Sequence, residues 1–238
     1  MVSNVNRLAA EGGVVVSHAP RRNHWLARMA YDVVVLTPPA IAVVITLLLA
    51  WQMRGVPLTL FDGILSPPGR PELYPSHWLS IGHAIVPVVF LIANLVNRRY
   101  GEDMALAHIF GSWSLVSLFA LAMLWRVHPA LPPVGAVPDL RVAAAFLGAM
   151  SIGQLAGVYV FDRTRGVEWW NAPVYSALTH AFVAMIIFYV AAYAGTDWTW
   201  INRMIVDIGV KATMAFALLV PYVLLRPIVR PTAGLGGY

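Results

Sequence analysis

The chain has 238 residues, of which 59% are hydrophobic and only 11% are charged, and its formal net charge is +5. An ordinary soluble domain is about 45–50% apolar and about 25% charged, so this chain carries too little charge to cover a surface exposed to water. The composition therefore excludes soluble globular and disordered proteins, and it predicts an all-α integral membrane protein.

We predict six transmembrane helices, because a helix needs about 20 mostly apolar residues to cross a bilayer. In chain order they are expected at residues 33–51, 79–97, 104–125, 140–161, 174–194 and 201–225. Residues 1–30 are predicted to be a cytoplasmic tail, 31–230 the six-helix membrane domain and 231–238 a C-terminal tail. The first thirty residues contain no apolar run of signal-peptide length, so we expect the tail to be retained and to be mobile up to about Arg21.

The arginines predict that the N-terminus and the C-terminus are both cytoplasmic, because cytoplasmic loops of membrane proteins are enriched in positive charge. The side that holds the termini carries ten of them: Arg7, Arg21, Arg22, Arg28, Arg98, Arg99, Arg163, Arg165, Arg226 and Arg230. The other side carries five: Arg54, Arg70, Arg126, Arg141 and Arg203. We expect a multi-pass protein of the bacterial inner (cytoplasmic) membrane, in contact with membrane lipid.

The first outer loop, residues 52–78, is rich in proline and glycine. Prolines restrict the backbone, which favours a stiff cap. A plain connector is an equally good interpretation of the same composition.

The predicted fourth helix contains a pair of small residues, Gly153 and Gly157, four positions apart. This spacing lets helices approach closely. We expect the close contact to lie within the monomer, and a homodimer is the alternative.

Ionisable groups inside a membrane helix are costly, so each is a hypothesis of a functional site. Asp207 and Lys211, the only lysine, are four residues apart on the last predicted helix and can pair on one face. They either fix helix packing as an ion pair or present one member to a substrate. Three further candidate substrate-binding residues are polar residues of other predicted helices: Asn94, Gln154 and His180. Each of these, taken alone, is more often an interhelical hydrogen bond than a ligand contact.

Motifs of catalysis are missing from the sequence. It contains no His-Glu-x-x-His, no Gly-x-Ser-x-Gly and no P-loop. The lack of cysteine excludes disulfides and thiolate chemistry. We therefore expect no enzyme activity, no cofactor, no metal site and no nucleic-acid partner.

Three segments resemble motifs of the queuosine precursor transporter family, also called the vitamin-uptake-transporter-like family. Residues 94–105, NLVNRRYGEDMA, are similar to Asp-x-x-x-Glu-x-Tyr-Gly-x-x-x-Ala. Residues 154–161, QLAGVYVF, are similar to Gln-Leu-x-Asp-Val-x-x-Phe. Lys211, Ala215 and Pro221-Tyr222 resemble the closing Lys-x-x-x-Ala…Thr-Pro-x-x-Tyr. Acidic positions of the family fall on Asn94, Arg98, Gly157, Ala184 and Leu219.

The resemblance implies six helices with the fold of the substrate-binding subunits of energy-coupling-factor transporters. It also implies uptake of a small-molecule substrate, 7-cyano-7-deazaguanine or 7-aminomethyl-7-deazaguanine, for tRNA modification. The first helix lacks a small-x-x-x-small pair, where coupled subunits meet their partner, so we expect a solitary carrier without an ATPase partner. The alternative is a non-transporting membrane subunit of a larger complex. A polar pocket at the candidate residues would indicate the carrier, and a closed bundle with an internal Asp207–Lys211 pair would indicate the subunit.

Overall fold

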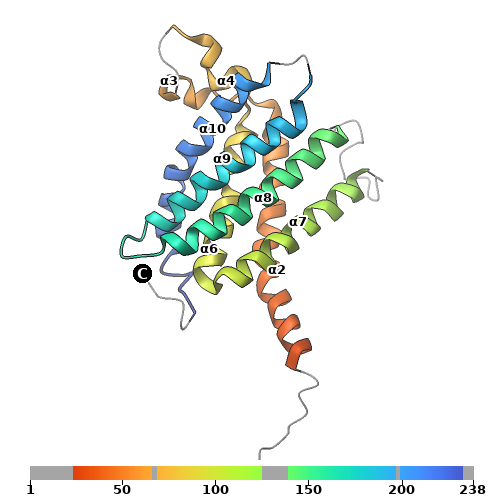
Figure 1. The fold of residues 1–238 in the computed structure, drawn as a ribbon, viewed down its shortest axis with the longest axis vertical. Coiled ribbons are helices and arrows are strands. Elements are labelled where there is room, and N and C mark those ends of the chain that lie inside the picture. Colours follow the sequence, from red (N-terminus) through yellow and green to blue (C-terminus); the bar gives the residue numbers. More distant parts are fainter. Residues whose placement is uncertain (1–23, 66–68, 125–138, 197–198, 233–238) are drawn as a thin grey trace, which may run out of the picture. The chain divides into compact units, whose positions relative to one another are not determined.

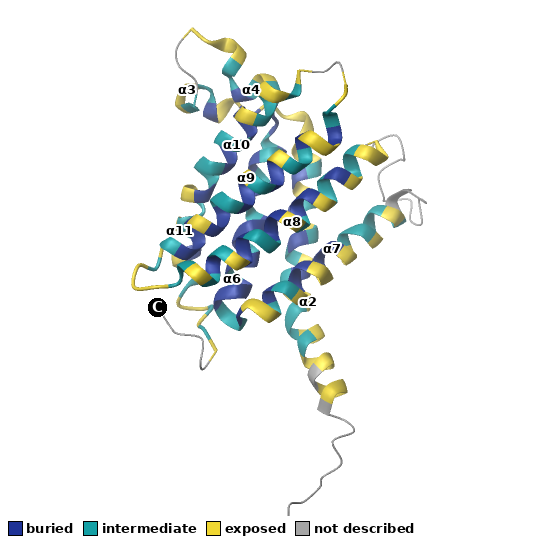
Figure 2. Ribbon diagram, in the orientation of Figure 1, coloured by how far each residue is buried: buried dark blue, intermediate teal, exposed yellow. Residues whose placement is uncertain are grey.

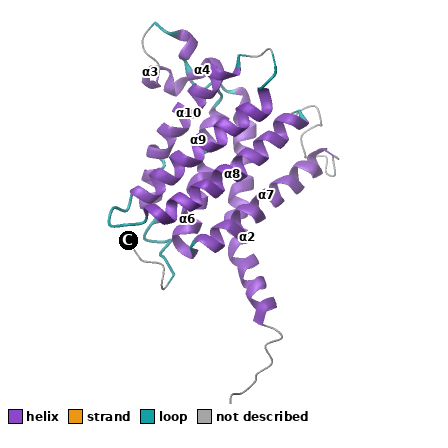
Figure 3. Cartoon of the chain, in the orientation of Figure 1, coloured by secondary structure: helices purple, strands orange, loops and turns teal. Residues whose placement is uncertain are grey.

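The computed structural model describes residues 24–65, 69–124, 139–196 and 199–232 of the chain. Its contacts divide the chain into two units, Met1–Val35 and Leu36–Tyr238. The expected mobility of the tail up to Arg21 lies outside the described residues, as do residues 233–238 of the predicted C-terminal tail. The described residues form helices and no β-strand, so the all-α prediction is confirmed (Figure 3).

Six stretches of helix in the described residues are long and apolar enough to cross a membrane, as the sequence predicts (Figure 1). Helix α2 begins at His24, so residues 24–30 of the segment predicted as a tail are helical. The stretches are α2 (His24–Gln52), α5 (Ile81–Ile85) with α6 (Val88–Tyr100), α7 (Glu102–Leu124), α8 (Leu140–Thr164), α9 (Asn171–Tyr193), and α10 (Trp200–Ala217) with α11 (Leu219–Leu225).

Prolines account for the breaks in the second and sixth stretches. Pro87 lies between α5 and α6, and it has no N–H group with which to continue the helical hydrogen bonds. Pro221 follows Ala217, the last residue of α10, by four positions and cannot donate to its carbonyl. Both breaks divide one membrane-crossing stretch into two shorter helices.

Helices α8 and α9 pack closely because small residues line their contact. A methyl group on Gly153 would approach the Cβ of Ala184 to 2.7 Å, and one on Gly157 would approach the Oγ of Ser176 to 3.1 Å. Figure 2 shows buried residues along both helices. The close contact predicted for Gly153 and Gly157 therefore lies within the chain.

The described part of the loop that was predicted to be the first outer loop, residues 52–78, folds into short helical segments. Backbone hydrogen bonds attach it to the start of the second stretch, from Leu58 N to Leu79 O (3.1 Å) and from Ile81 N to Val56 O (2.8 Å). Leu58 and other apolar side chains pack in one cluster with Val206 and Val210 of α10. The loop is thus a packed cap rather than a plain connector. Its segments are η2 (Met53–Gly55), η3 (Thr59–Phe61), α3 (Asp62–Leu65), η4 (Pro71–Leu73) and α4 (Pro75–Trp78).

The segment after α11 folds back onto the end of α6. The backbone N–H and the hydroxyl of Thr232 both donate to the carbonyl of Arg99, at 2.9 and 3.1 Å. Arg98 Nε donates to the carbonyl of Val229 at 3.3 Å. Arg98 and Val229 lie 131 residues apart in sequence, so these contacts join two distant parts of the chain.

Candidate functional site

Helix α10 carries three charged residues at four-residue spacing, Arg203, Asp207 and Lys211. This spacing places them on one face of the helix. The ammonium of Lys211 donates to Oδ1 of Asp207, and the two residues are only 2% and 1% exposed. The predicted pairing on one face is therefore present, and the pair is internal.

Neighbouring helices add polar groups to this charged face. The hydroxyl of Tyr189 in α9 donates to Oδ2 of Asp207 at 3.1 Å. His83 in α5 places its Nε2 3.2 Å from a terminal guanidinium nitrogen of Arg203. The backbone N–H of Ser80 donates to the other ring nitrogen of His83 at 3.1 Å, within a capping box that begins α5. The charged face thus meets polar groups of α5 and α9.

His180 of α9 is a further buried polar residue and is 2% exposed. Its ring stacks on Phe90 of α6, with ring centroids 3.4 Å apart. Within the described residues, Nε2 of His180 is buried and has no hydrogen-bond partner. A buried polar atom without a partner is costly, so this nitrogen is a strong candidate for contact with a bound molecule.

Asn94 of α6 is bound to the first half of α9. Its Oδ1 accepts from the hydroxyl of Ser176 at 2.7 Å, and its Nδ2 donates to the carbonyl of Pro173 at 3.2 Å. Ser176 precedes His180 by one helical turn. Asn94 therefore contacts α9 about one helical turn before His180. Both the oxygen and the nitrogen of its side-chain amide form hydrogen bonds to α9.

Gln154 of α8 faces a different helix. Its Oε1 accepts from the indole N–H of Trp113 in α7 at 2.6 Å, and both residues are buried. The preceding residue, Gly153, touches His180 instead. Gln154 thus follows directly in sequence the residue that contacts His180, while its own side-chain amide oxygen accepts a hydrogen bond from α7.

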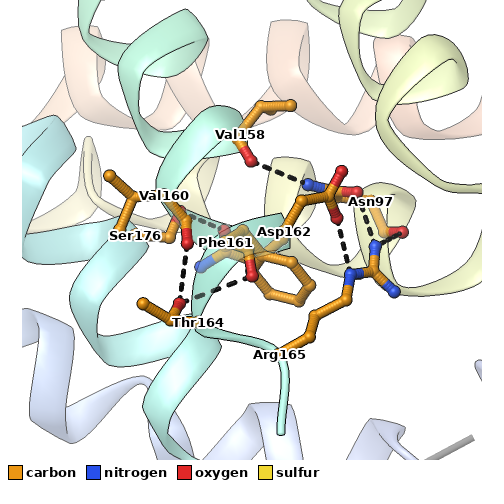
Figure 4. A network of polar contacts seen from close by, with 9 residues as sticks. Asn97, Val158, Val160, Phe161, Asp162, Thr164, Arg165 and Ser176 are labelled. Carbon is orange, nitrogen blue, oxygen red and sulfur yellow. Dashed lines mark hydrogen bonds and ion pairs between the residues drawn. The ribbon is translucent and has the colours of Figure 1, made fainter. Parts of the chain in front are cut away.

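A second polar network lies where α6 and α8 end (Figure 4). Arg165, in the loop after α8, donates to Asp162 at 2.5 Å and to the backbone and side-chain oxygens of Asn97, both at 2.7 Å. Asn97 in turn donates to the carbonyl of Val158 at 3.4 Å. This network ties α6 to α8 at the end that the arginine count predicts to be cytoplasmic.

The structure therefore does not bring the five predicted site residues into one group. Lys211 and Asp207 bond to each other, His180 packs on Phe90, Asn94 bonds to Ser176, and Gln154 bonds to Trp113. Sequence reasoning missed the contributions of four residues: His83, Tyr189, Arg203 and Trp113. Arg203 could have been found, because it precedes Asp207 by four positions, but it was used only in the count of arginines on the outer side.

The small residues at family acidic positions have a packing role. Gly157 and Ala184 both lie in the contact between α8 and α9, and Ala184 is fully buried. A carboxylate at either position would have no room beside the opposite helix.

Two hollows lie elsewhere on the described surface. A groove of about 540 Å³ between α7 and α8 is lined by Trp113, Ser117, Leu118, Gly148 and other residues. A smaller hollow of about 30 Å³ lies beside the loop between α8 and α9. Trp113 lines the groove and also donates to Gln154, so a single indole separates this buried amide from the groove.

Comparisons with known proteins agree with the motifs. Residues 80–225, more than half of the chain, match the family model described as "Putative vitamin uptake transporter". The chain is 28% identical over 149 residues to a protein of Escherichia coli (strain K12) named "Queuosine precursor transporter", a match that covers 57% of this chain and 66% of that protein. The chain thus spans slightly less than two thirds of the length of this curated relative. No solved structure matches the chain.

Proposed function

This chain belongs to the vitamin uptake transporter family, and from that premise we propose that it is a membrane carrier that imports a small heterocycle. The substrate class is 7-cyano-7-deazaguanine, 7-aminomethyl-7-deazaguanine or a close analogue. The name of the Escherichia coli relative supports this class. The family and relative are both described as transporters rather than enzymes.

The observation that carries the proposal is the polar cluster inside an apolar bundle. Charged groups at membrane depth are expensive and usually mark substrate or ion pathways. Here Asp207 and Lys211 are almost fully buried, and His180 keeps a ring nitrogen without a partner in the described residues. A planar heterocycle with donor and acceptor groups would supply that partner.

We further propose that Asn94 and Gln154 contact the substrate only after they exchange their present partners. Asn94 would release Ser176 or Pro173, and Gln154 would turn from Trp113. Amide side chains both donate and accept, which suits the mixed edge of a deazapurine. The carrier works without an ATPase partner in the bacterial inner membrane, with both termini in the cytoplasm.

The test is uptake of radiolabelled 7-cyano-7-deazaguanine into cells that lack their own transporter for it. Cells expressing the chain should accumulate label, and His180→Ala should abolish accumulation at unchanged membrane expression. The variant Tyr175→Ala is the control, because Tyr175 lies on the same helix but is exposed. No uptake above the empty-vector level would contradict the proposal.

A second candidate function is a non-transporting membrane subunit of a larger complex. One observation favours it, namely that Lys211 and Asp207 are bonded to each other inside the bundle. If the chain co-purifies with a fixed partner and imports nothing, this second function replaces the first.

A further inference from the structure

We propose that His83 is a positioning residue for transport, because its imidazole selects whether Lys211 or Arg203 is the partner of Asp207. We call this change of partner the partner exchange. It rests on the proposed function in one respect, namely that Lys211 contacts the substrate once Asp207 releases it. The exchange itself involves only residues of this chain, so it can be measured without a substrate.

Asp207 is an acid with a cation four residues away on either side. Arg203 precedes it and Lys211 follows it, so the three share one face of α10. The Lys211 ammonium donates to Oδ1 of Asp207, whereas a terminal guanidinium nitrogen of Arg203 lies 3.2 Å from Nε2 of His83. Both cations are donors that a carboxylate can accept from. The face therefore has a second arrangement, in which Arg203 turns to Asp207 and Lys211 is released.

The ring of His83 cannot make all of its contacts at once. Its Nδ1 lies 3.1 Å from the backbone nitrogen of Ser80 and 3.0 Å from the Ser80 hydroxyl oxygen. Its Nε2 faces Arg203, which can only donate. A neutral imidazole has one N–H group and one acceptor nitrogen, so it cannot accept from the Ser80 backbone and from Arg203 together. These two hydrogen bonds are mutually exclusive, and they define two states of His83.

In the first state the imidazole proton is on Nδ1. This N–H group donates to the hydroxyl of Ser80, and Nε2 accepts from Arg203. The guanidinium is thereby held at the start of α5. Asp207 keeps the ammonium of Lys211 and the hydroxyl of Tyr189 as its partners.

In the second state the imidazole proton is on Nε2. Nδ1 then accepts from the backbone N–H of Ser80, within the capping box of α5. An N–H group on Nε2 faces the N–H groups of Arg203, so that contact breaks. The guanidinium turns to Asp207, four positions along its own helix, and competes with Lys211 for the carboxylate. Lys211 is then available to a substrate.

Ser80 connects this exchange to the cap. Its neighbours Leu79 and Ile81 form backbone hydrogen bonds with Leu58 and Val56 of the cap. A movement of the cap therefore changes the position of the Ser80 groups that contact the imidazole. The cap lies on the predicted outer side, where import begins, so the exchange links that side to the buried ammonium.

The first experiment observes Lys211 directly, because it is the only lysine of the chain. Full-length protein with isotopically labelled lysine, in lipid nanodiscs, should give one side-chain ammonium signal in nuclear magnetic resonance spectra. Asp207→Asn provides the reference signal of an ammonium without its carboxylate. We expect His83→Leu to shift the signal toward this reference, because Arg203 then takes Asp207.

Three further variants separate the partner exchange from local damage. His83→Gln keeps an acceptor for Arg203 and a donor for Ser80, so the signal should stay at the wild-type position. His77→Leu, at an exposed histidine of the cap, should also leave it there. Adding Arg203→Met to His83→Leu removes the competing cation and should return the signal to the wild-type position. A shift that persists in this double variant, or no shift in folded His83→Leu, overturns the partner exchange.

The proton position on His83 gives a test that stands even if His83→Leu fails to fold. In protein with isotopically labelled histidine, the signals that disappear in His83→Gln belong to this ring. We expect the proton on Nδ1 in the wild-type protein and on Nε2 in Arg203→Met, where the backbone N–H of Ser80 takes Nδ1. The same proton position in both proteins would contradict the inference.

Uptake of 7-cyano-7-deazaguanine separates the role of His83 from the carrier. If the wild-type protein imports the compound, His83→Leu should lower the initial rate about fivefold or more, as is usual for coupled sites, and His83→Gln should restore it. Equal rates in the wild type and His83→Leu overturn the role of His83 in transport while the carrier stands. If the spectra behave as expected but the wild-type protein imports nothing, the partner exchange stands and the carrier is overturned.

Discussion

Gly153 of α8 lies directly against His180 of α9, so that a methyl group on Gly153 would come within 2.8 Å of the ring carbon Cδ2. It would also come within 3.1 Å of the His180 carbonyl oxygen. The position of the imidazole is therefore set by the absence of a side chain on the opposite helix. His180 cannot keep its stacking on Phe90 if that space is filled.

We predict that Gly153→Ala destabilises the protein and abolishes uptake. The extra methyl group overpacks the contact, at a cost of about 1–3 kcal/mol, and displaces His180. Gly148→Ala is the control, because nothing lies within 4 Å of a methyl group at that position on the same helix. Thermal unfolding in detergent and substrate uptake measure the two effects. Equal behaviour of the two variants would show that the close approach has no consequence.

A double-mutant cycle tests the role of Asp207 and Lys211. Removing one partner strands a buried charge and should cost about 3–5 kcal/mol. We expect Asp207→Asn with Lys211→Met to recover most of that stability but not the uptake, because we propose that Lys211 also contacts the substrate. Recovery of both stability and uptake would make the pair purely structural. Glu72→Gln, which removes an exposed ion pair with Arg70, should change stability by less than about 1 kcal/mol.

The pairing of Gln154 with Trp113 separates a binding role from a packing role. Gln154→Leu leaves the buried indole N–H unpaired and should cost about 1–3 kcal/mol in stability as well as abolishing uptake. Trp113→Phe removes the same hydrogen bond but keeps the side-chain amide of Gln154. We therefore expect Trp113→Phe to retain uptake, measured as initial rate per expressed protein. Loss of uptake in both variants to the same degree would assign Gln154 to packing alone.

The orientation predicted from the arginines is testable on this cysteine-free chain. Single cysteines at Leu60 in the cap and Val167 in the loop after α8 replace residues that are 74% and 85% exposed. A membrane-impermeant maleimide added to intact cells should label Leu60→Cys and leave Val167→Cys unlabelled until the cells are opened. The reverse pattern would place the termini outside.

Local sequence signals were sufficient for the helices and for contacts within one helix. Hydropathy located the six membrane-crossing stretches, and four-residue spacing identified Asp207 with Lys211 and Gly153 with Gly157. These features depend on periodicity along a single element, which a sequence displays directly.

The sequence did not predict which residues of different helices contact one another. The sequence marks Gln154 as a buried polar residue, but only the crossing of α7 and α8 makes Trp113 its partner. His83 lies near the start of the second predicted helix, residues 79–97, and only the structure shows that it contacts Arg203 of α10. The fold of the outer loop was undecided for the same reason, since packing on Val206 and Val210 distinguishes a cap from a connector.

The return of the chain after α11 to the end of α6 has a consequence for biogenesis. Arg99 gives its carbonyl to Thr232, which is among the last residues that the structure describes. A ribosome that has just delivered α6 to the membrane has not yet made the segment that covers its end. The helix end must therefore stay exposed to water, or to a chaperone, throughout insertion of α7 to α11. Closure of this end therefore follows the synthesis of α11 and of the segment after it.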